Sequence, residues 1–471
     1  MYKKSRSFLA VAGFRRRVFL GVLATLVAML AAGCSLLEGP QNPVIPTPPP
    51  TSRPIPLEAL TEGEYVLNPV SDVAPGIDPE CVTLVNALSQ QQLMSYVQTL
   101  EGFGTRSTFS VIDRDDRGIG ATRRWIFNEF ERVGGSRLQV EFQDYGLNFE
   151  GRSNVQRNVI ATLPGTSDHA GVVVLMANYD TRAIDWLDGS SHSPGADDNG
   201  SGVAALLEIA RLLSSRSWNQ TIVFAALTAE EQGTFGSRHF VEDALFDGLT
   251  IDAAINNDMI GGRAGIPQSV RLYADGPDTA NNRQLARYIE YIGGLYLPTF
   301  TINTINALDR EDRWGDHREF VQAGIAAVRL IESQEDLSIQ NSVRDTWDLI
   351  DYAYFSKVVQ LNLATLCNVI GAPPPPPIPV IVEMADPGSY LLNWPVAPEA
   401  AGYAISFRPL GSDEYPSFRF VGGDEAGNVV LTGYDPNTTY AVSLAALDGR
   451  GRISYFSPEV FIGPEQTAAA Q

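Results

Sequence analysis

The sequence contains few cysteines, few histidines and few charged residues for its length. Its 471 residues include three Cys and four His, and only 19% are Asp, Glu, Lys or Arg. Three cysteines are too few for a disulfide-based scaffold or a thiolate metal cluster. With 44% hydrophobic residues, the chain is too apolar to be disordered and too long for one ordinary domain. We therefore expect more than one folded domain.

Positive charge is scarce outside the N-terminus. The net charge is −21, and it becomes −27 without residues 1–33, which hold six basic residues and no acid. A chain of this sign repels phosphate backbones, which argues against nucleic acid as a partner.

The N-terminal segment has the pattern of an export signal. An uncharged run over residues 18–33 follows three arginines, is short for a transmembrane helix and ends in small residues. The string LAAGC, which ends at Cys34, resembles a bacterial lipobox, although Ala31 stands where that motif prefers leucine. This resemblance implies a lipoprotein signal peptide over residues 1–33 and a lipid anchor on Cys34, on the outer side of a bacterial membrane. Alternatives are an ordinary cleaved signal or a membrane anchor. RRVFL also resembles the core of a twin-arginine signal, which is compatible with export in a folded state.

Proline-rich stretches divide the rest of the chain. The string GPQNPVIPTPPPTSRPIP cannot pack and tends to stay extended, so we interpret residues 34–79 as a tether. A second such stretch, residues 372–379, separates a large domain over residues 80–371 from a small one over residues 380–464. Residues 465–471 are predicted to be a disordered tail.

The large domain alternates apolar β-like runs with helical patterns. This pattern predicts an α/β fold with a central mixed, mainly parallel sheet flanked by helices. The runs are NVIATL, VVVLMA, IVFAAL, AAIN and AAVRLI, and acids follow four of them: Asp180, Glu230, Glu231, Asp258 and Glu332. Because open α/β sheets bind ligands beyond the carboxyl ends of their strands, these acids predict one acidic cleft.

The string GADDNGSG, residues 195–202, adds further acids before a helical pattern. Taken alone, Asp197, Asp198 and Asn199 would be turn and helix-cap residues, and Glu230-Glu231 a solvated helix start. Together with the strand-end acids they indicate more than capping. Carboxylates gathered at one edge repel one another, and burying unpaired charge is costly. A bound divalent cation is the usual compensation.

Six motifs carry a resemblance to a known family. They occur in the order NYDTR, GADDNGSG, TAEEQGTFGSRHF, NNDMIGG, GDHREF and NSVRDT. Over roughly Leu84 to Ile370 the chain resembles metallopeptidase family 28, whose relatives include bacterial leucyl aminopeptidases, glutamate carboxypeptidase and glutaminyl cyclase. The resemblance implies a zinc-exopeptidase fold, a peptide or protein substrate, and hydrolysis from one end of the chain by a metal-activated water.

The resemblance also implies roles for individual residues. Asp198 matches the ligand that bridges two zinc ions, and Glu231 and Asp258 each match a ligand of one zinc. Glu230 matches the general base. Asp180 matches the acid that orients a metal-bound histidine. Asp316 and His317 match a motif that lines the cleft without binding metal.

Two positions depart from the family pattern. Asn178 and Asn341 stand where the family has its two zinc-binding histidines. Asparagine offers a neutral carbonyl oxygen in place of a nitrogen donor. The resulting all-oxygen set suits magnesium, calcium or manganese better than zinc. His192 is the one unassigned histidine near a motif that could replace a lost ligand, although a surface-loop position fits it better.

The small domain alternates strand-like runs with turns. DPNTTY resembles the tyrosine corner of fibronectin type III domains, and Trp394 and Tyr403 match their core aromatic residues. A β-sandwich of seven strands fits the length, and we interpret it as a spacer or adhesion module.

If Cys34 is acylated, Cys81 and Cys367 remain in an oxidising compartment. We expect these two thiols to pair. The alternative is two separately buried free thiols.

Two classes of function follow. The first is a metal-dependent aminopeptidase with a remodelled site, and the second is a catalytically inactive binding protein on a peptidase fold. The two missing imidazoles favour the second, whereas the retained acids favour the first. Glutaminyl-cyclase-like acyl transfer is a minor alternative.

Overall fold

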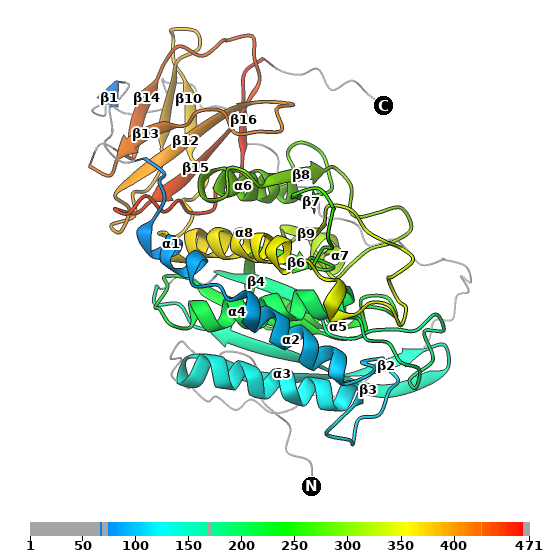
Figure 1. The fold of residues 1–471 in the computed structure, drawn as a ribbon. Helices are drawn as coiled ribbons and strands as arrows, with labels where there is room; N and C mark the ends of the chain where they lie inside the picture. Colours follow the sequence, from blue (N-terminus) through cyan, green and yellow to red (C-terminus); the bar gives the residue numbers. More distant parts are fainter. Residues whose placement is uncertain (1–65, 68–73, 168–170, 425, 465–471) are drawn as a thin grey trace, which may run out of the picture.

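The computed structural model describes residues 66–67, 74–167, 171–424 and 426–464 (Figure 1). The predicted signal peptide, Cys34, most of the tether and the tail at 465–471 lie outside these ranges. Within them, none of the helices combines the length and hydrophobicity needed to cross a bilayer.

An eight-stranded sheet forms the centre of the large domain, with the strand order β2-β3-β5-β4-β6-β9-β7-β8. The strands are β2 Gln139–Phe149, β3 Arg152–Leu163, β4 Gly171–Asn178, β5 Thr221–Leu227, β6 Thr250–Asn257, β7 Ser269–Tyr273, β8 Thr301–Ile305 and β9 Ala327–Glu332. The central strands β5, β4, β6 and β9 are parallel, and antiparallel pairs join β2 to β3, β3 to β5 and β7 to β9. The predicted mixed, mainly parallel sheet is confirmed.

Helices cover both faces of this sheet because its central strands are apolar on both sides. Val173 and Leu175 of β4 share a core with α1–α4, α6 and α8, whereas Val174 and Met176 pack with α5 and α7. The helices are α1 Pro79–Asn86, α2 Gln90–Gly102, α3 Gly118–Gly134, α4 Gly202–Leu213, α5 Phe235–Phe246, α6 Asn281–Tyr296, α7 His317–Gln322 and α8 Tyr352–Gly371.

The N-terminal helix α1 is joined covalently to the last helix of the domain, α8. Cys81 and Cys367 are fully buried and form the expected disulfide, with their Cα atoms 5.9 Å apart. Asp78 caps α1 by accepting hydrogen bonds from backbone N–H groups of its first turn, and Pro79 suits the first helical position. The described fold therefore begins before residue 80.

The small domain is a β-sandwich of two sheets, ordered β1-β14-β11-β10 and β13-β12-β15-β16. The strands are β1 Val66–Leu67, β10 Val380–Glu383, β11 Tyr390–Asn393, β12 Gly402–Pro409, β13 Arg419–Gly422, β14 Asn428–Leu431, β15 Tyr440–Leu447 and β16 Val460–Ile462. Trp394 and Tyr403 lie in its core, as expected. The Tyr440 hydroxyl accepts a hydrogen bond from the Asp435 N–H at 3.2 Å, as a tyrosine corner does.

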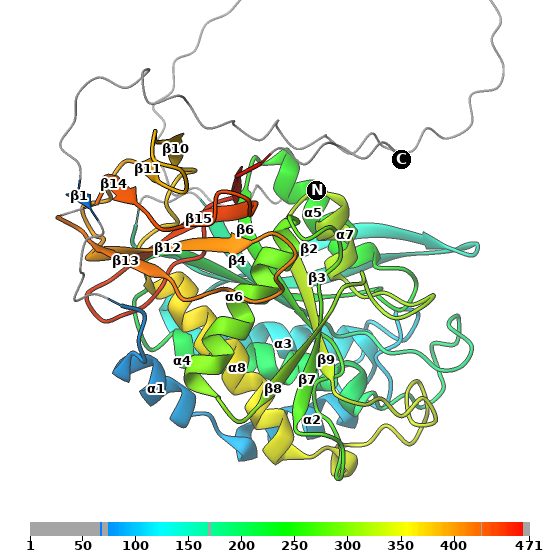
Figure 2. The same cartoon turned by 90° about the horizontal axis from the view of Figure 1, so that it is seen from above.

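The sandwich packs directly on α6, as Figure 2 also shows. The Tyr288 hydroxyl donates to the Ile453 carbonyl at 2.7 Å, and Gln284 donates to the Ser457 carbonyl at 2.8 Å. Arg408, whose side chain is fully buried, lies 2.6 Å from Asp278. The interface also buries apolar side chains of both domains in one cluster. It therefore fixes the sandwich to the large domain, which the interpretation of the sandwich as a spacer did not anticipate.

Candidate active site

The acids that follow the central strands meet at one edge of the sheet. β4 ends at Asn178, β5 at Leu227 and β6 at Asn257, and these strands are parallel neighbours. Their carboxyl ends therefore lie side by side, and the residues beyond them border the same space.

A cavity of about 330 Å³ lies at this edge. It is lined by four predicted acids and one of the two substituted positions: Asp198, Glu230, Glu231, Asp258 and Asn341. Four arginines line it as well: Arg182, Arg310, Arg313 and Arg329. His192, the candidate replacement ligand, is exposed and does not line the cavity.

Asp198 is held by a kinked segment, Ala196–Ser201, just before α4. The Asp345 carboxylate accepts hydrogen bonds from the N–H groups of Asp197 at 2.8 Å and Asp198 at 2.9 Å. The Asn199 amide donates to Asn178 Oδ1 at 2.7 Å and to a carbonyl at the end of β6. The segment is thus tied to the strand ends, and the oxygen of Asn178 is already used as an acceptor.

Asp180 lies beneath the cavity rather than in its wall. It is fully buried and accepts hydrogen bonds from the N–H groups of Glu230 at 3.3 Å and Glu231 at 3.2 Å. Burial raises the pKa of Asp180 to about 6, although these hydrogen bonds act in the opposite direction. Its position supports the Glu230-Glu231 turn.

Asp316 and His317 are buried outside the cavity wall, contrary to the expectation that they line the cleft. His317 Nε2 lies 2.6 Å from the Leu308 carbonyl, and burial lowers the pKa of this imidazole, which keeps it neutral. Burial raises the pKa of Asp316 well above its usual value. Neither side chain is presented to a ligand in the cavity.

Asp258 forms an ion pair with a buried arginine. Arg329 of β9 is 0% exposed, and its Nη2 lies 2.9 Å from Asp258 Oδ2. The same guanidinium pairs with Asp309. Burial would raise the pKa of Asp309, but Arg329 and Arg310 lower it to about 2. Both carboxylates are therefore held by a fixed cation.

Glu231 forms the second ion pair. Arg182 Nε lies 2.7 Å from Glu231 Oε2. With its amide assigned by the hydrogen bonds around it, Asn341 donates to Glu231 Oε1 at 3.1 Å and accepts from Arg182 Nη2 at 3.2 Å. The oxygen of Asn341 thus faces a guanidinium, as an acceptor would.

Asp198 and Glu230 differ in their partners. Asp198 Oδ2 accepts a hydrogen bond from Gln340 Nε2 at 2.8 Å. Among the described residues no donor bonds to the Glu230 carboxylate, whose pKa is raised by burial and then by the nearby charges of Asp258 and Glu231. Glu230 is the one cavity carboxylate of the predicted set that lacks a protein partner in the described chain.

The residues present do not fit the two-zinc arrangement that the family resemblance implies. Zinc prefers nitrogen or sulfur donors with tetrahedral geometry, and here each implied ligand already has a protein partner. Within the described ranges, only Asp78, Cys81 and Cys367 bring three carboxylate, thiol or imidazole ligand atoms within 4.8 Å of one another, and these thiols form the disulfide. Guanidinium groups of Arg182 and Arg329 lie beside Glu231 and Asp258 and offset the negative charge of these carboxylates.

The sequence interpretation missed Arg182, Arg329 and Gln340. Arg329 carried a readable signal, because it is the one charged residue in the otherwise apolar run AAVRLI. An arginine inside a buried strand requires an acidic partner. Arg182 is the last residue of the motif NYDTR, in which only Asp180 and Asn178 were interpreted as site residues.

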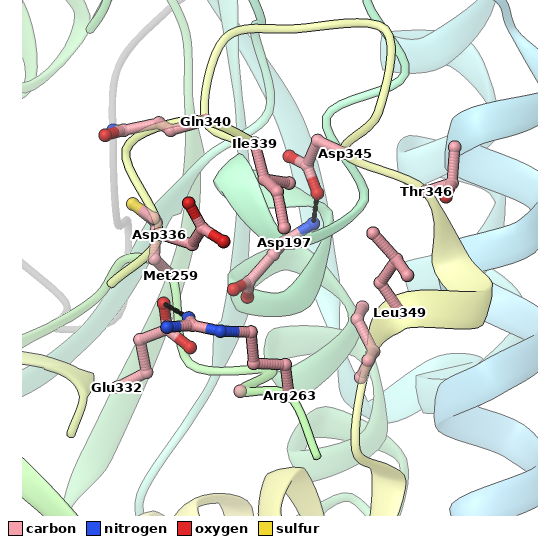
Figure 3. A pocket seen from close by; sticks show the side chains of 12 residues that line it. Asp197, Met259, Arg263, Glu332, Asp336, Ile339, Gln340, Asp345, Thr346 and Leu349 are labelled. Atoms are coloured by element: carbon pink, nitrogen blue, oxygen red, sulfur yellow. Dashed lines mark hydrogen bonds and ion pairs between the residues drawn. The ribbon is translucent and has the colours of Figure 1, made fainter. Parts of the chain in front are cut away.

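Glu332 lies outside the main cavity, contrary to its expected place in the same cleft. It borders a separate cavity with Asp197, Arg263 and Asp345 (Figure 3). That cavity has a volume of about 30 Å³, which is room for one water molecule. Arg263 Nη1 lies 3.5 Å from Glu332 Oε1, and burial raises the pKa of Glu332 to about 8.

Comparison with known proteins shows which family this chain is similar to. Residues 158–366 match the family model described as Peptidase family M28. The resemblance to this family is confirmed. A "Probable zinc metalloprotease" of Pyricularia oryzae is 28% identical over 488 residues, which cover 91% of this chain and 97% of that protein. This match extends well beyond the M28 segment, residues 158–366.

Two solved structures share the fold of about two thirds of this chain. LapB from Legionella pneumophila has a TM-score of 0.52 and 23% identity over 64% of this chain and 77% of its own. The LapA aminopeptidase of the same organism has a TM-score of 0.52 and 19% identity over the same shares. Family M28 implies a divalent metal, typically zinc, and peptide or protein substrates. The donor set of this chain departs from that implication.

Proposed function

We propose that this chain is a catalytically silent binding protein, which takes up peptides in the M28 cleft without hydrolysing them. The proposal rests on two ion pairs, Arg329–Asp258 and Arg182–Glu231. In each of them the arginine contacts an acid that matches a zinc ligand of the family. A zinc centre lowers the pKa of a bound water to about 7 through an open coordination position. A guanidinium has no such position, so it neutralises the acids without activating water.

A metal-dependent exopeptidase is the second candidate, and Glu230 favours it. This carboxylate has no described hydrogen-bond donor, and its raised pKa suits a general base. An oxygen-rich ligand set would select magnesium, calcium or manganese over zinc. In that case Arg182 and Arg329 must move away from Glu231 and Asp258 when the metal binds.

Turnover assays separate the two candidates. The purified chain is incubated with aminoacyl-nitroanilides, and with glutaminyl peptides to test cyclisation, in the presence of zinc, manganese, magnesium or calcium. We expect no turnover with any ion, and unchanged peptides by mass spectrometry. Metal-dependent release that persists in Glu242→Gln, an exposed α5 control, but disappears in Glu230→Gln would overturn the proposal.

We also propose that the chain is exported and anchored by a lipid on Cys34, at the outer side of a bacterial membrane. The LAAGC string supports this, and the Cys81–Cys367 disulfide suits an oxidising compartment. Palmitate labelling tests the anchor, since Cys34→Ala should abolish it. Equal labelling of Cys34→Ala and the unaltered chain would reject lipidation at this position.

A further inference from the structure

Two partly exposed tryptophans, Trp186 and Trp314, line the main cavity, and other exposed apolar side chains lie near lining residues in the sequence. They lie on three loops that also supply cavity-lining residues: Ile184 and Trp186 after β4, Trp314 before α7, and Leu337 and Val343 after β9. Ile184 is 91% exposed and Leu337 is 68% exposed. Apolar side chains gathered around a polar cavity are typical of a surface that another chain covers.

The cavity itself carries a negative balance. Its charged lining consists of four arginines and five acids, the acids being Asp198, Glu230, Glu231, Asp258 and Asp312. Arg182 and Arg329 are already paired with Glu231 and Asp258. Among the described residues no donor bonds to the Glu230 carboxylate, so a cationic group of a bound ligand would supply the missing partner. The net charge of −27 beyond residue 33 also attracts a basic partner.

We propose that the cleft binds an apolar peptide segment that crosses its mouth and inserts one internal basic side chain toward Glu230. This inference rests on the proposed function, binding without hydrolysis. In the sheet, β4 and β9 lie on opposite sides of β6, so their apolar loops flank the mouth from two sides. A segment that crosses the mouth covers both loops, and a long side chain reaches the cavity from it. A peptide end placed in the cavity would leave one side uncovered.

Binding of a designed probe tests the inserted side chain. The probe is an N-acetylated, C-amidated nonapeptide of alternating leucine and alanine with one central lysine, and its partner has norleucine in that position. Fluorescence anisotropy measures both peptides against the purified full chain in detergent. We expect the norleucine peptide to bind about tenfold more weakly, as for loss of one charged hydrogen bond.

Variants assign the preference to Glu230 and to the loops. Glu230→Gln keeps the shape of the side chain and should remove the preference for lysine, whereas Glu242→Gln, at an exposed position of α5, should keep it. Trp314→Ala should weaken both peptides by the same factor. Unchanged unfolding midpoints show that each variant is folded.

Several results would overturn the inference. Equal affinity for the lysine and norleucine peptides would show that the cavity does not bind a basic side chain. If neither peptide binds, the apolar side chains do not form a peptide-binding surface. Tight binding that requires a free N-terminus, whatever the central residue, would assign the cavity to a peptide end. The turnover assays with unblocked substrates test the proposed function separately, because hydrolysis there overturns silence and leaves the lysine preference of the end-blocked peptides standing.

Discussion

Replacing Arg329 by methionine removes the cation that Asp258 and Asp309 share, while keeping a side chain of similar length. Asp258 is 4% exposed, Asp309 is 8% exposed and Arg329 is 0% exposed. Removing one partner of a buried ion pair leaves an uncompensated charge and costs about 3–5 kcal/mol of unfolding free energy. Arg310 still pairs with Asp309, so we expect a loss near the lower end of that range.

The loss should be specific to the pairing of charges. Adding Asp258→Asn to Arg329→Met removes the stranded carboxylate, and coupled residues of this kind show interaction energies of about 0.5–3 kcal/mol. The double variant should therefore be more stable than Arg329→Met alone. Arg114→Met is the control, because Arg114 pairs with Asp116 on the exposed surface and should show no measurable change.

Urea unfolding followed by tryptophan fluorescence measures these differences. If Arg329→Met unfolds at the same urea concentration as the unaltered chain, the ion pair does not stabilise the fold. If Asp258→Asn destabilises Arg329→Met by the same amount as it destabilises the unaltered chain, the two residues are not coupled. Either result would refute the reasoning.

Three further predictions concern pH and the disulfide. The pKa of Asp309 is about 2 in the fold and about 3.9 when unfolded, so its contribution of about 2–3 kcal/mol is present above pH 4 and is lost as the pH falls towards 2. Urea titrations from pH 5 to pH 2 should show this loss, and a smaller one in Arg329→Met. The pKa of Glu332 is raised to about 8 in the fold. Its contribution to the free energy of unfolding is therefore complete below the pKa that it has in the unfolded chain, and declines as the pH rises to 8. Glu332→Gln should flatten that decline, and an unchanged slope would contradict it. Replacing Cys367 by alanine opens a loop of 286 residues and should cost about 5 kcal/mol on the chain-entropy model, as thermal unfolding with and without reductant would show. Equal midpoints would contradict this value.

The strand-end acids were predictable because their placement depends on local pattern and one topological rule. Runs such as VVVLMA and IVFAAL have the apolar character of buried parallel strands, and parallel neighbours end at the same edge. Glu230 and Asp258 therefore line one cavity, whereas Asp180 lies beneath it and holds the Glu230-Glu231 turn. Glu332 does not line this cavity, because it still belongs to β9 and points into a different one.

The ion pairs could not be derived in the same way. Arg329 reaches Asp258 because β9 pairs with β6 in the register that sets Arg329 opposite Asn256. That register depends on the whole sheet, whereas the two residues are distant in the chain. The orientation of Gln340 toward Asp198 depends likewise on how the loop after β9 returns over the cavity. The asparagines at the positions that match histidines were visible in the sequence, but the arginines beside the acids were not.

Metal content is the most direct test of the central claim that arginines, rather than metal ions, neutralise the acids of this cleft. The purified chain is equilibrated with zinc, manganese, magnesium or calcium, dialysed, and analysed for metal per chain beside Asp198→Ala. We predict no stoichiometric ion in either protein, and equal values for both. One or two tightly held ions per unaltered chain, absent from Asp198→Ala, would contradict the account.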